Sequence, residues 1–291
     1  MFGASHLTRP YFTCIVVSHN KPVHVAEALA SLAHQTFEDW EAIVFDSGVL
    51  YDKGYFQTLN VASDPRVRLV RSWETEELRA TKTIASWCFN ECFRKDLVRG
   101  TFITYLCDDD LLDAGAYEAF YRYSQQHPGT MAMYGSAEMT VITDRGERLF
   151  LRDSPARELK GRCCRGGGLD GHVDYLQVCH HRDVLKTFPD DEYWPESRAN
   201  IRHADGIFLE RIGEHFPIVP VPARIGENRK VSASLNDGGE RLHELEKLCR
   251  KAAADRRLRQ KLGLVGAVRI RYGIADLYRS FHKRLPGLAK P

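Results

Sequence analysis

Short apolar segments alternate with amphipathic ones along the first 130 residues of the chain. Four segments are short and apolar, as buried strands are, and they span Tyr11 to Ser18, Trp40 to Phe45, Val67 to Val70 and Thr101 to Leu106. Apolar residues at helical spacing follow the first strand and return twice, over Val25 to Leu32, Leu78 to Phe93 and Ala114 to Gln126. Strands that alternate with helices predict a mostly parallel sheet covered on both faces.

The second half of the chain has a less regular pattern. Met131 to Ile142 and Arg148 to Leu151 predict a hairpin around the turn Asp144-Arg145-Gly146. A polar, Gly-rich stretch from Asp153 to Gly171 predicts a loop. Further along, the pattern predicts a return to the core, a helix, a strand and a basic helical tail, over Val173 to Cys179, Ala204 to Ile212, Ile218 to Val221 and from about Gly238 onward.

These patterns divide the chain into three parts. Residues 1–130 form an α/β half with the ligand-binding edge, and residues 131–237 form a second half of the same domain with a smaller antiparallel region. Residues 238–291 form a basic helical extension. The extension has two interpretations: a surface that contacts an anionic membrane, or a helix that packs on the body or on a second subunit.

Composition limits the class of protein without changing the fold prediction. Hydrophobic residues make up 43% of the 291-residue chain and charged residues 27%, which is typical of a globular protein. The formal net charge of +2 gives no reason to expect a nucleic-acid partner. Met1 to Pro10 lacks the features of a secretory signal, so we expect a cytoplasmic protein, with the basic tail allowing peripheral membrane contact. The eight cysteines are expected to be reduced.

Three of the predicted strands end in polar residues. The first ends at Ser18-His19-Asn20, the second at Asp46-Ser47, and the fourth at Asp108-Asp109-Asp110. In sheets of this class, ligands bind beyond the carboxyl ends of the strands. The convergence of three such ends predicts one ligand site at this edge.

The triplet Asp108-Asp109-Asp110 carries the strongest chemical signal. Adjacent carboxylates repel one another, so a cation is expected beside them. Oxygen ligands suit Mg²⁺ or Mn²⁺, and such an ion keeps open positions for diphosphate oxygens. The alternative is a solvated acidic loop before the next helix. The position of the triplet at a strand end favours the metal site.

Other candidates depend more on context. Asp46 can accept hydrogen bonds from a base or ribose, or can simply form a turn. Arg79 and Lys82 can pair with phosphate or base oxygens, or can lie on a solvated helix face. Asp205 is a candidate general base, or an ordinary first-turn carboxylate of a helix. His180 can reach a metal or phosphate, or can be a satisfied core histidine.

A zinc site is disfavoured. His180-His181, Cys179 and Cys163-Cys164 offer ligand types that zinc accepts. Their spacing does not match a zinc site, because the chain has no Cys-x-x-Cys pair here and no second pair at finger distance.

Several of these segments, in order, resemble inverting family-2 glycosyltransferases of the GT-A fold. The resemblance is nearest to the type that makes spore-coat polysaccharide, and it covers roughly residues 11–222. It rests on Val17-Ser18-His19-Asn20, His34-Gln35-Thr36-Phe37, the strand Trp40 to Asp46, Arg79 to Thr83, Thr104 to Asp110, Val178-Cys179-His180 and Ala204-Asp205-Gly206. It implies a Rossmann-like, mostly parallel sheet flanked by helices.

The resemblance also implies an activity and its residues. The protein would transfer a sugar from a UDP- or dTDP-sugar to a hydroxyl of a glycan or lipid-linked acceptor, with Mn²⁺ or Mg²⁺ on the diphosphate. Asp205 would be the general base. The nucleotide would contact Val17, Ser18, Asp46, Arg79 and Asp108, and the metal would contact Asp109. To these the residue patterns add Asn20 and Lys82 on the nucleotide side, and Asp110 and His180 as further candidate metal ligands. Three positions depart from the family pattern: His19, Phe45 and Asp110.

Two other functions remain open on the sequence. A metal-dependent nucleotidyltransferase also combines acidic strand ends with a nucleotide and a metal. Many such enzymes have a Gly-rich phosphate loop near the N-terminus, whereas His19-Asn20-Lys21-Pro22 has no glycine. The third hypothesis is a non-catalytic module that binds a nucleotide sugar or a partner protein through the basic tail, and the acidic triplet argues against it.

Overall fold

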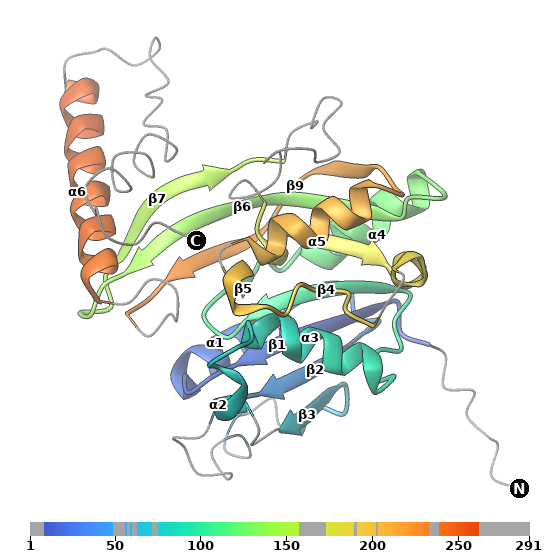
Figure 1. The fold of residues 1–291 in the computed structure, drawn as a ribbon. Helices are drawn as coiled ribbons and strands as arrows, with labels where there is room; N and C mark the ends of the chain where they lie inside the picture. Colours follow the sequence, from blue (N-terminus) through green and yellow to red (C-terminus); the bar gives the residue numbers. More distant parts are fainter. Residues whose placement is uncertain are drawn as a thin grey trace, which may run out of the picture. The chain divides into compact units, whose positions relative to one another are not determined.

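The computed structural model describes residues 9–48, 56, 59, 63–71, 75–156, 173–188, 191–201, 203–232 and 239–261. In this part of the chain a mixed sheet has the strand order β3-β2-β1-β4-β8-β6-β9-β5, and β7 pairs with β6 (Figure 1). The strands are β1 (Phe12–Ser18), β2 (Trp40–Asp46), β3 (Val67–Arg71), β4 (Phe102–Cys107), β5 (Leu111–Leu112), β6 (Ala132–Ile142), β7 (Arg148–Ser154), β8 (Val178–His181) and β9 (Ile218–Lys230). The helices are α1 (Pro22–Ala33), α2 (Thr75–Leu78), α3 (Ile84–Arg94), α4 (Ala116–Gln126), α5 (Ala204–Gly213) and α6 (Gly239–Lys261).

The four strands predicted in the first half form the parallel part of the sheet. β1 lies between β2 and β4, and β3 pairs with the outer side of β2. Their side chains are largely buried in β1, β2 and β4, which explains why these strands are continuous apolar runs in the sequence. The register pairs Ser18 with Asp46 and Val17 with Cys107, so the three polar strand ends meet at one edge.

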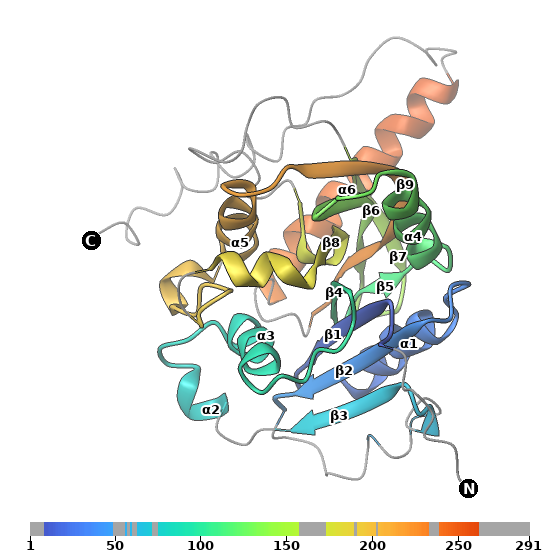
Figure 2. The same cartoon turned by 90° about the vertical axis from the view of Figure 1, so that its right-hand side faces the viewer.

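Helices cover both faces of this sheet. One core packs α1 and α4 against the side chains of β1 and β2 that include Phe12, Val16 and Val44. The other core packs α3 and α5 against the alternate residues, which include Ile15, Ile43 and the fully buried Tyr105 of β4. In Figure 2 the two pairs of helices lie on opposite sides of the strands. The mixed α/β architecture, with helices on both faces, was predicted from the alternation of strands and helices.

The second half extends the same sheet with mixed strand directions. β8 runs antiparallel to β4 and to β6, whereas β9 runs parallel to β6. The two-residue strand β5, which follows the acidic triplet, pairs with β9 at the far edge. The chain therefore leaves β4 at the middle of the sheet and reaches β9 within a few residues, so the triplet lies between these two strands.

Two expectations about element boundaries were wrong. The helix expected from Leu78 to Phe93 is two helices, α2 and α3, joined by a turn at residues 79–83. The strand expected to end at Val221 continues to Lys230, through Pro222 and a register shift against β6. The expected return to the core over Val173 to Cys179 is confirmed, since Val173, Leu176 and Cys179 are buried, and the segment includes a 3-10 turn at Tyr175–Gln177 before β8.

The β6–β7 hairpin forms around the predicted turn, where Gly146 has a φ of +76°. The first part of α6 packs on this hairpin in a small apolar cluster, through Leu242 and Cys249 against Val141 and neighbouring leucines. By internal contacts the chain divides into two compact units, Met1–Cys249 and Arg250–Pro291. The described part of the second unit is the last part of α6.

The described cysteines are free thiols, as expected: Cys14, Cys88, Cys92, Cys107, Cys179 and Cys249. Cys163 and Cys164, most of the expected Gly-rich loop, and the tail from residue 262 lie outside the described residues. None of the helices in the described ranges has an apolar stretch long enough to cross a bilayer.

Candidate functional site

The carboxyl ends of β1, β2 and β4 bring buried polar residues together. Ser18, Asp46 and Asp108 are each no more than 2% exposed. The backbone extends the strand pairing by one step, because the amide of Asp108 donates to the carbonyl of Val17 at 3.0 Å. The carbonyl of Ser18 accepts from the amide and the hydroxyl of Ser47 at 2.9 and 3.0 Å. The predicted edge is therefore one continuous polar surface.

Lys21 lies between the first two aspartates of the triplet. Its Nζ donates to Oδ1 of Asp108 at 2.8 Å and to Oδ2 of Asp109 at 2.9 Å. The other oxygen of Asp108 accepts from the backbone amide of His19 at 2.8 Å. Burial opposes the charge of Lys21, but the negative charges of Asp109 and Asp108 outweigh it and raise the pKa of Lys21 above its ordinary value. The ammonium is therefore firmly charged.

Asp110 faces a different set of partners. Its Oδ1 accepts from the backbone amide of Arg229 at 2.8 Å, and its Oδ2 lies 3.4 Å from Nδ2 of Asn228. The same Asn228 amide donates to Asp174 at 2.9 Å. Burial, together with the charges of Asp109 and Asp174, raises the pKa of Asp110 well above its ordinary value. The three adjacent aspartates thus have unlike environments.

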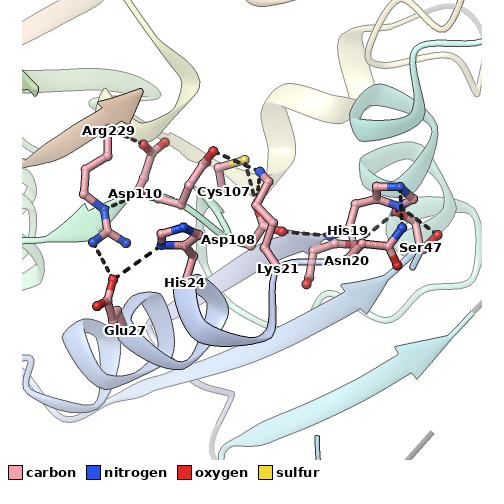
Figure 3. A network of polar contacts seen from close by, with 12 residues as sticks. His19, Asn20, Lys21, His24, Glu27, Ser47, Cys107, Asp108, Asp110 and Arg229 are labelled. Atoms are coloured by element: carbon pink, nitrogen blue, oxygen red, sulfur yellow. Dashed lines mark hydrogen bonds and ion pairs between the residues drawn. The ribbon is translucent and has the colours of Figure 1, made fainter. Parts of the chain in front are cut away.

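Arg229 fastens the acidic loop to two distant parts of the fold. Its Nε donates to the backbone carbonyl of Asp109, and its Nη1 donates to Glu27 of α1 at 2.5 Å. Figure 3 shows the resulting chain of contacts, which runs from Arg229 and Glu27 across the aspartates and Lys21 to His19. Because Arg229 is only 7% exposed, its guanidinium acts as an internal brace.

The side chain of Arg79 reaches this edge from the turn between α2 and α3. Its Nη2 lies 2.5 and 2.9 Å from the two ring nitrogens of His19. The ring of His19 also contacts the Ser47 carbonyl at 3.0 Å and the Asn20 amide at 3.0 Å (Figure 3). A neutral imidazole ring has one donor and one acceptor nitrogen, so Ser47, Asn20 and Arg79 together fix the orientation of this ring.

Asp46 is already paired within the protein. Its Oδ2 accepts from Nε of Arg71 at 3.0 Å and lies 2.9 Å from Nη2 of the same guanidinium. Its Oδ1 accepts from the backbone amide of Gly48 at 3.0 Å. A Cβ atom on Gly48 would lie 2.7 Å from Oδ1 of Asn20, so only glycine fits between Asp46 and Asn20.

Two predicted site residues are engaged elsewhere. Lys82 donates to the buried Glu196, which also binds Asn90 at 2.8 Å and Arg94 at 2.6 Å. This network joins α3 to the segment before α5. Among the described contacts, none places Lys82 with the aspartates.

His180 is a core residue in this structure. It is fully buried, its Nε2 lies 2.7 Å from the hydroxyl of Tyr105, and its Nδ1 lies 3.0 Å from the carbonyl of His181. Burial lowers the pKa of His180 to about 4, so the ring is neutral at pH 7. Both ring nitrogens are occupied by protein partners, and the geometry gives the satisfied-histidine alternative rather than a metal ligand.

Asp205 lies in the first turn of α5, and strand pairings give the direction of this helix. The helix leads into β9, whose first residue Ile218 pairs with Ala132. Ala132 pairs with His180, which in turn pairs with Ile103 near the start of β4. The end of α5 therefore lies toward the start of β4, and its beginning points toward the carboxyl edge. Asp205 is thus expected on the side of the acidic triplet.

The donor set fits a small divalent cation. The Sγ of Cys107 and carboxylate oxygens of Asp108 and Asp109 lie within 4.8 Å of one another. An ammonium already sits at hydrogen-bonding distance from both carboxylates, which shows that the position suits a cation. Burial and the nearby carboxylates raise the pKa of the Cys107 thiol well above its ordinary value, so at pH 7 the oxygens are the stronger ligands.

Sequence reasoning missed several residues of this site. Lys21 stands at a strand end, as Asn20 does, and this position was the signal that could have identified it. Arg229 and Asn228 lie beyond the expected end of a strand, and no sequence pattern connects them to Asp110, which comes 119 and 118 positions earlier. Asp174 caps the 3-10 turn before β8 and gave no separate signal.

Comparisons with known proteins agree with this architecture. No family model matches the sequence. Protein CgeD of Bacillus subtilis (strain 168) is 23% identical over 215 residues, which cover 71% of this chain and 47% of that protein. The chain therefore spans about half the length of this curated relative.

Among solved structures, S. aureus TarS 1-349 superposes with a TM-score of 0.50 at 14% sequence identity, covering 75% of this chain and 60% of that chain. The same fragment in complex with UDP-GlcNAc gives a TM-score of 0.50 over 80% of this chain and 60% of that chain. Its complex with UDP gives 0.50 over 82% and 64%. At this identity the likeness is one of fold, and it shows that the chain has a GT-A-like glycosyltransferase fold.

Proposed function

We propose that the protein is a glycosyltransferase that takes a sugar from a nucleotide-diphosphate donor and transfers it to a hydroxyl acceptor with inversion. The observation that carries the proposal is the buried acidic triplet at the carboxyl edge of a GT-A-like sheet, beside the polar ends of β1 and β2. The likeness to TarS, whose structures hold UDP-GlcNAc and UDP, supports a uridine or related pyrimidine nucleotide as the donor.

The nucleotide is assigned to the end of the site that contains Asp46 and Arg79. Val17, Ser18 and Asn20 line this end, and the contacts of His19 hold Arg79 beside them. Asp46 is held by Arg71, which fixes the orientation of its carboxylate. Asp108, anchored by the His19 amide, is assigned to the ribose hydroxyls. Lys82 is assigned a supporting role, because Glu196 holds its ammonium.

The diphosphate and its metal are assigned to the other end of the triplet. Asp109, with Asp108 and Cys107 beside it, is the residue proposed to hold Mn²⁺ or Mg²⁺, and Asp110 positions the loop through Arg229. When bound, such an ion supplies positive charge to a diphosphate leaving group. Lys21 and Arg79 supply further positive charge at this edge of the sheet.

Asp205 is proposed as the general base. Support comes from its place in the first turn of α5, the end of the helix on the side of the carboxyl edge, where an acceptor hydroxyl would approach the sugar opposite the diphosphate. The carboxylate would take the proton of the acceptor hydroxyl while the hydroxyl oxygen bonds to the anomeric carbon and the nucleoside diphosphate leaves. This single displacement would invert the configuration at the anomeric carbon. The acceptor is assigned to the class of glycan or lipid-linked hydroxyls, which places the activity in polysaccharide synthesis.

Calorimetry with UDP and Mn²⁺, followed by a transfer assay, tests this function. Asp109→Ala should remove the Mn²⁺-dependent part of UDP binding, because the metal loses its carboxylate ligand. Asp205→Asn should bind UDP normally and lose transfer by about a hundredfold or more. Asp183→Asn, which changes an exposed carboxylate paired with Lys186, is the matched control and should change neither.

The products of the assay separate this proposal from its alternatives. Release of UDP with formation of a glycoside supports the glycosyltransferase. Release of pyrophosphate would identify a nucleotidyltransferase instead. Absence of any nucleotide binding, with or without Mn²⁺, would contradict both enzyme assignments.

A further inference from the structure

Lys21 occupies the position that a bound cation would need. Of the lysines that the structure describes, Lys21 is the buried one, with 6% of its surface exposed. Its ammonium contacts Oδ1 of Asp108 and Oδ2 of Asp109 at 2.8 and 2.9 Å. A divalent ion bound to these carboxylates would sit within about 2–2.6 Å of their oxygens, in the same small volume. The ammonium and the ion therefore exclude each other from the space between these oxygens.

While both are ionised, Asp108 and Asp109 need a compensating positive charge beside them. Asp108 is 1% exposed and Asp109 is 5% exposed. Two buried carboxylates side by side are strongly destabilising unless a cation compensates them. Before any ligand binds, Lys21 provides that charge. A cation that enters must replace it.

We infer that Lys21 is an internal counter-ion that competes with a divalent cation for Asp108 and Asp109, and that is released to bind the anion arriving with that cation. The competition follows from the geometry of the free protein alone. The identity of the anion as a nucleoside diphosphate rests on the proposed function.

The place of Lys21 in the fold favours such an exchange. It is the residue before α1, and its backbone is fixed by the amide of Val25, which donates to its carbonyl at 2.9 Å. Its flexible side chain can therefore move away from the carboxylates while remaining within a few ångströms of them. The helix that starts here has its N-terminus at the same edge, which also favours an anion.

The exchange predicts coupling between the cation and the diphosphate. In the natural protein, Mn²⁺ alone must displace the ammonium and leave it without a partner, so binding is weak. With UDP present, the released ammonium gains phosphate oxygens as new partners, so both ligands bind more tightly together. This coupling should depend on the positive charge at position 21.

Titration of Mn²⁺ into the 291-residue chain, monitored by calorimetry or electron paramagnetic resonance, tests the inference. In the absence of UDP, Lys21→Met should bind Mn²⁺ about tenfold more tightly or better than the natural protein, because a competing charge at contact distance is gone. Lys21→Arg should keep the weak binding. Lys247→Met, which removes an exposed lysine paired with Glu244, is the matched control and should not change the affinity.

The second measurement repeats these titrations with UDP. The natural protein should show a large gain in Mn²⁺ affinity on addition of UDP, and Lys21→Met a much smaller gain. Unchanged or weaker binding of Mn²⁺ by Lys21→Met without UDP would overturn the inference. Equal tightening by Lys21→Arg would also overturn it, because the charge would then not be the cause.

Two controls keep this test separate from that of the proposed function. Circular dichroism and thermal unfolding confirm that the variants fold, and Mn²⁺ should raise the melting temperature of Lys21→Met more than that of the natural protein. If UDP binds to no variant while Lys21→Met still has a higher affinity for Mn²⁺, the proposed function is contradicted and the inference about Lys21 is supported. If UDP and Mn²⁺ bind as proposed while Lys21→Met has no effect, the counter-ion alone fails.

Discussion

Buried ionisable side chains of this protein avoid an uncompensated charge in two ways: they pair with an opposite charge, or they stay neutral. Asp108 and Asp109 share an ammonium, and Glu196 is surrounded by Lys82, Arg94 and the amide of Asn90. His180 instead remains neutral, because its position inside the aromatic core offers no counter-charge. The ion pairs can be tested by substituting one partner at a time. The neutral histidine can be tested by measuring how the stability of the fold changes with pH.

The stability of the fold should fall when the pH is lowered from about 6.5 to about 4 through the titration of His180. Burial holds the pKa of His180 near 4 in the folded state, whereas an unfolded chain protonates histidine near 6.5. Between these values the unfolded state binds the extra proton, so stability is lost as the pH falls. The loss from this residue should reach about 3 kcal/mol.

Urea denaturation at several pH values measures this effect. His180→Gln, which cannot take up the proton, should show a flatter profile between pH 6.5 and 4. The exposed His215, changed to Gln, serves as the control and should leave the slope as it is. An equally steep profile in His180→Gln would mean that other groups cause the acid sensitivity.

Gly48 should be more sensitive to a methyl group than an ordinary surface glycine. A Cβ atom there would lie 2.7 and 2.9 Å from the side chain and backbone of Asn20, which already has a φ of +54°. Gly48→Ala should therefore displace the loop after β1 and weaken UDP binding by about tenfold or more, with a loss of about 1–3 kcal/mol in stability. At Gly115 a Cβ atom meets nothing within 4 Å, so Gly115→Ala is the control and should bind UDP normally.

At the scale of the elements, loops that carry site residues are tied to helices by charge networks. Glu196 joins the segment before α5 to α3, and the same segment holds the turn of Arg79 through Arg198, whose amide donates to the carbonyl of Thr81 at 2.9 Å. The conformation of the turn at residues 79–83, which includes Arg79, therefore depends on the contacts of Glu196 and Arg198.

Removing the charge of Glu196 should loosen that turn. Glu196→Gln leaves Lys82 and Arg94 without their shared carboxylate, and we expect a loss of about 2 kcal/mol in the free energy of unfolding, since both cations are partly exposed. Hydrogen exchange should increase in residues 79–83. Glu118→Gln, in the surface pair with Arg122, should change stability by less than about 0.5 kcal/mol and leave exchange unaltered.

The elements that the sequence predicts best are those whose pattern is local. β1, β2 and β4 are buried on both faces, so each is an uninterrupted apolar run, and the acidic triplet is visible because it follows such a run. β9 was underestimated because Pro220, Pro222 and Gly226 break the strand pattern, whereas pairing with β6 on one side keeps the segment extended.

The sequence predicted one part of the candidate site, the strand ends, and not the other, the partners of the aspartates. The three strand ends could be placed together from the parallel topology alone. The partners of the aspartates could not, because the contacts of Lys21 and Arg229 depend on how β9 and α1 approach the loop in three dimensions. The break between α2 and α3 was missed because residues 79–83, which form the turn, contain neither glycine nor proline, the residues that usually mark the end of a helix in a sequence.

At the scale of the whole molecule, the first unit includes the beginning of α6. Leu242 is 4% exposed and packs with Cys249 against Val141 and the leucines of β7. Val141 pairs with Lys230, the last residue of β9, so this cluster supports the strand end next to Arg229.

Leu242→Ala should therefore destabilise the fold by about 2–4 kcal/mol, because it leaves a cavity between α6 and the hairpin. Urea denaturation with tryptophan fluorescence measures the loss. Lys247→Ala, on the exposed side of the same helix, should stay within about 0.5 kcal/mol of the natural protein. Equal stability of the two variants would show that α6 does not contribute to the folded core.

The brace formed by Arg229 has a consequence for the order in which the protein is made. Asp109 and Asp110 leave the ribosome roughly 120 residues before the arginine that binds them. Until then the nascent chain can form the β1–β2–β4 core but has nothing to hold the loop after β4 against β9. A nascent chain stalled before residue 229 should therefore contain a folded half-sheet that does not yet recognise its ligand, and ligand recognition should appear only in the last stage of synthesis.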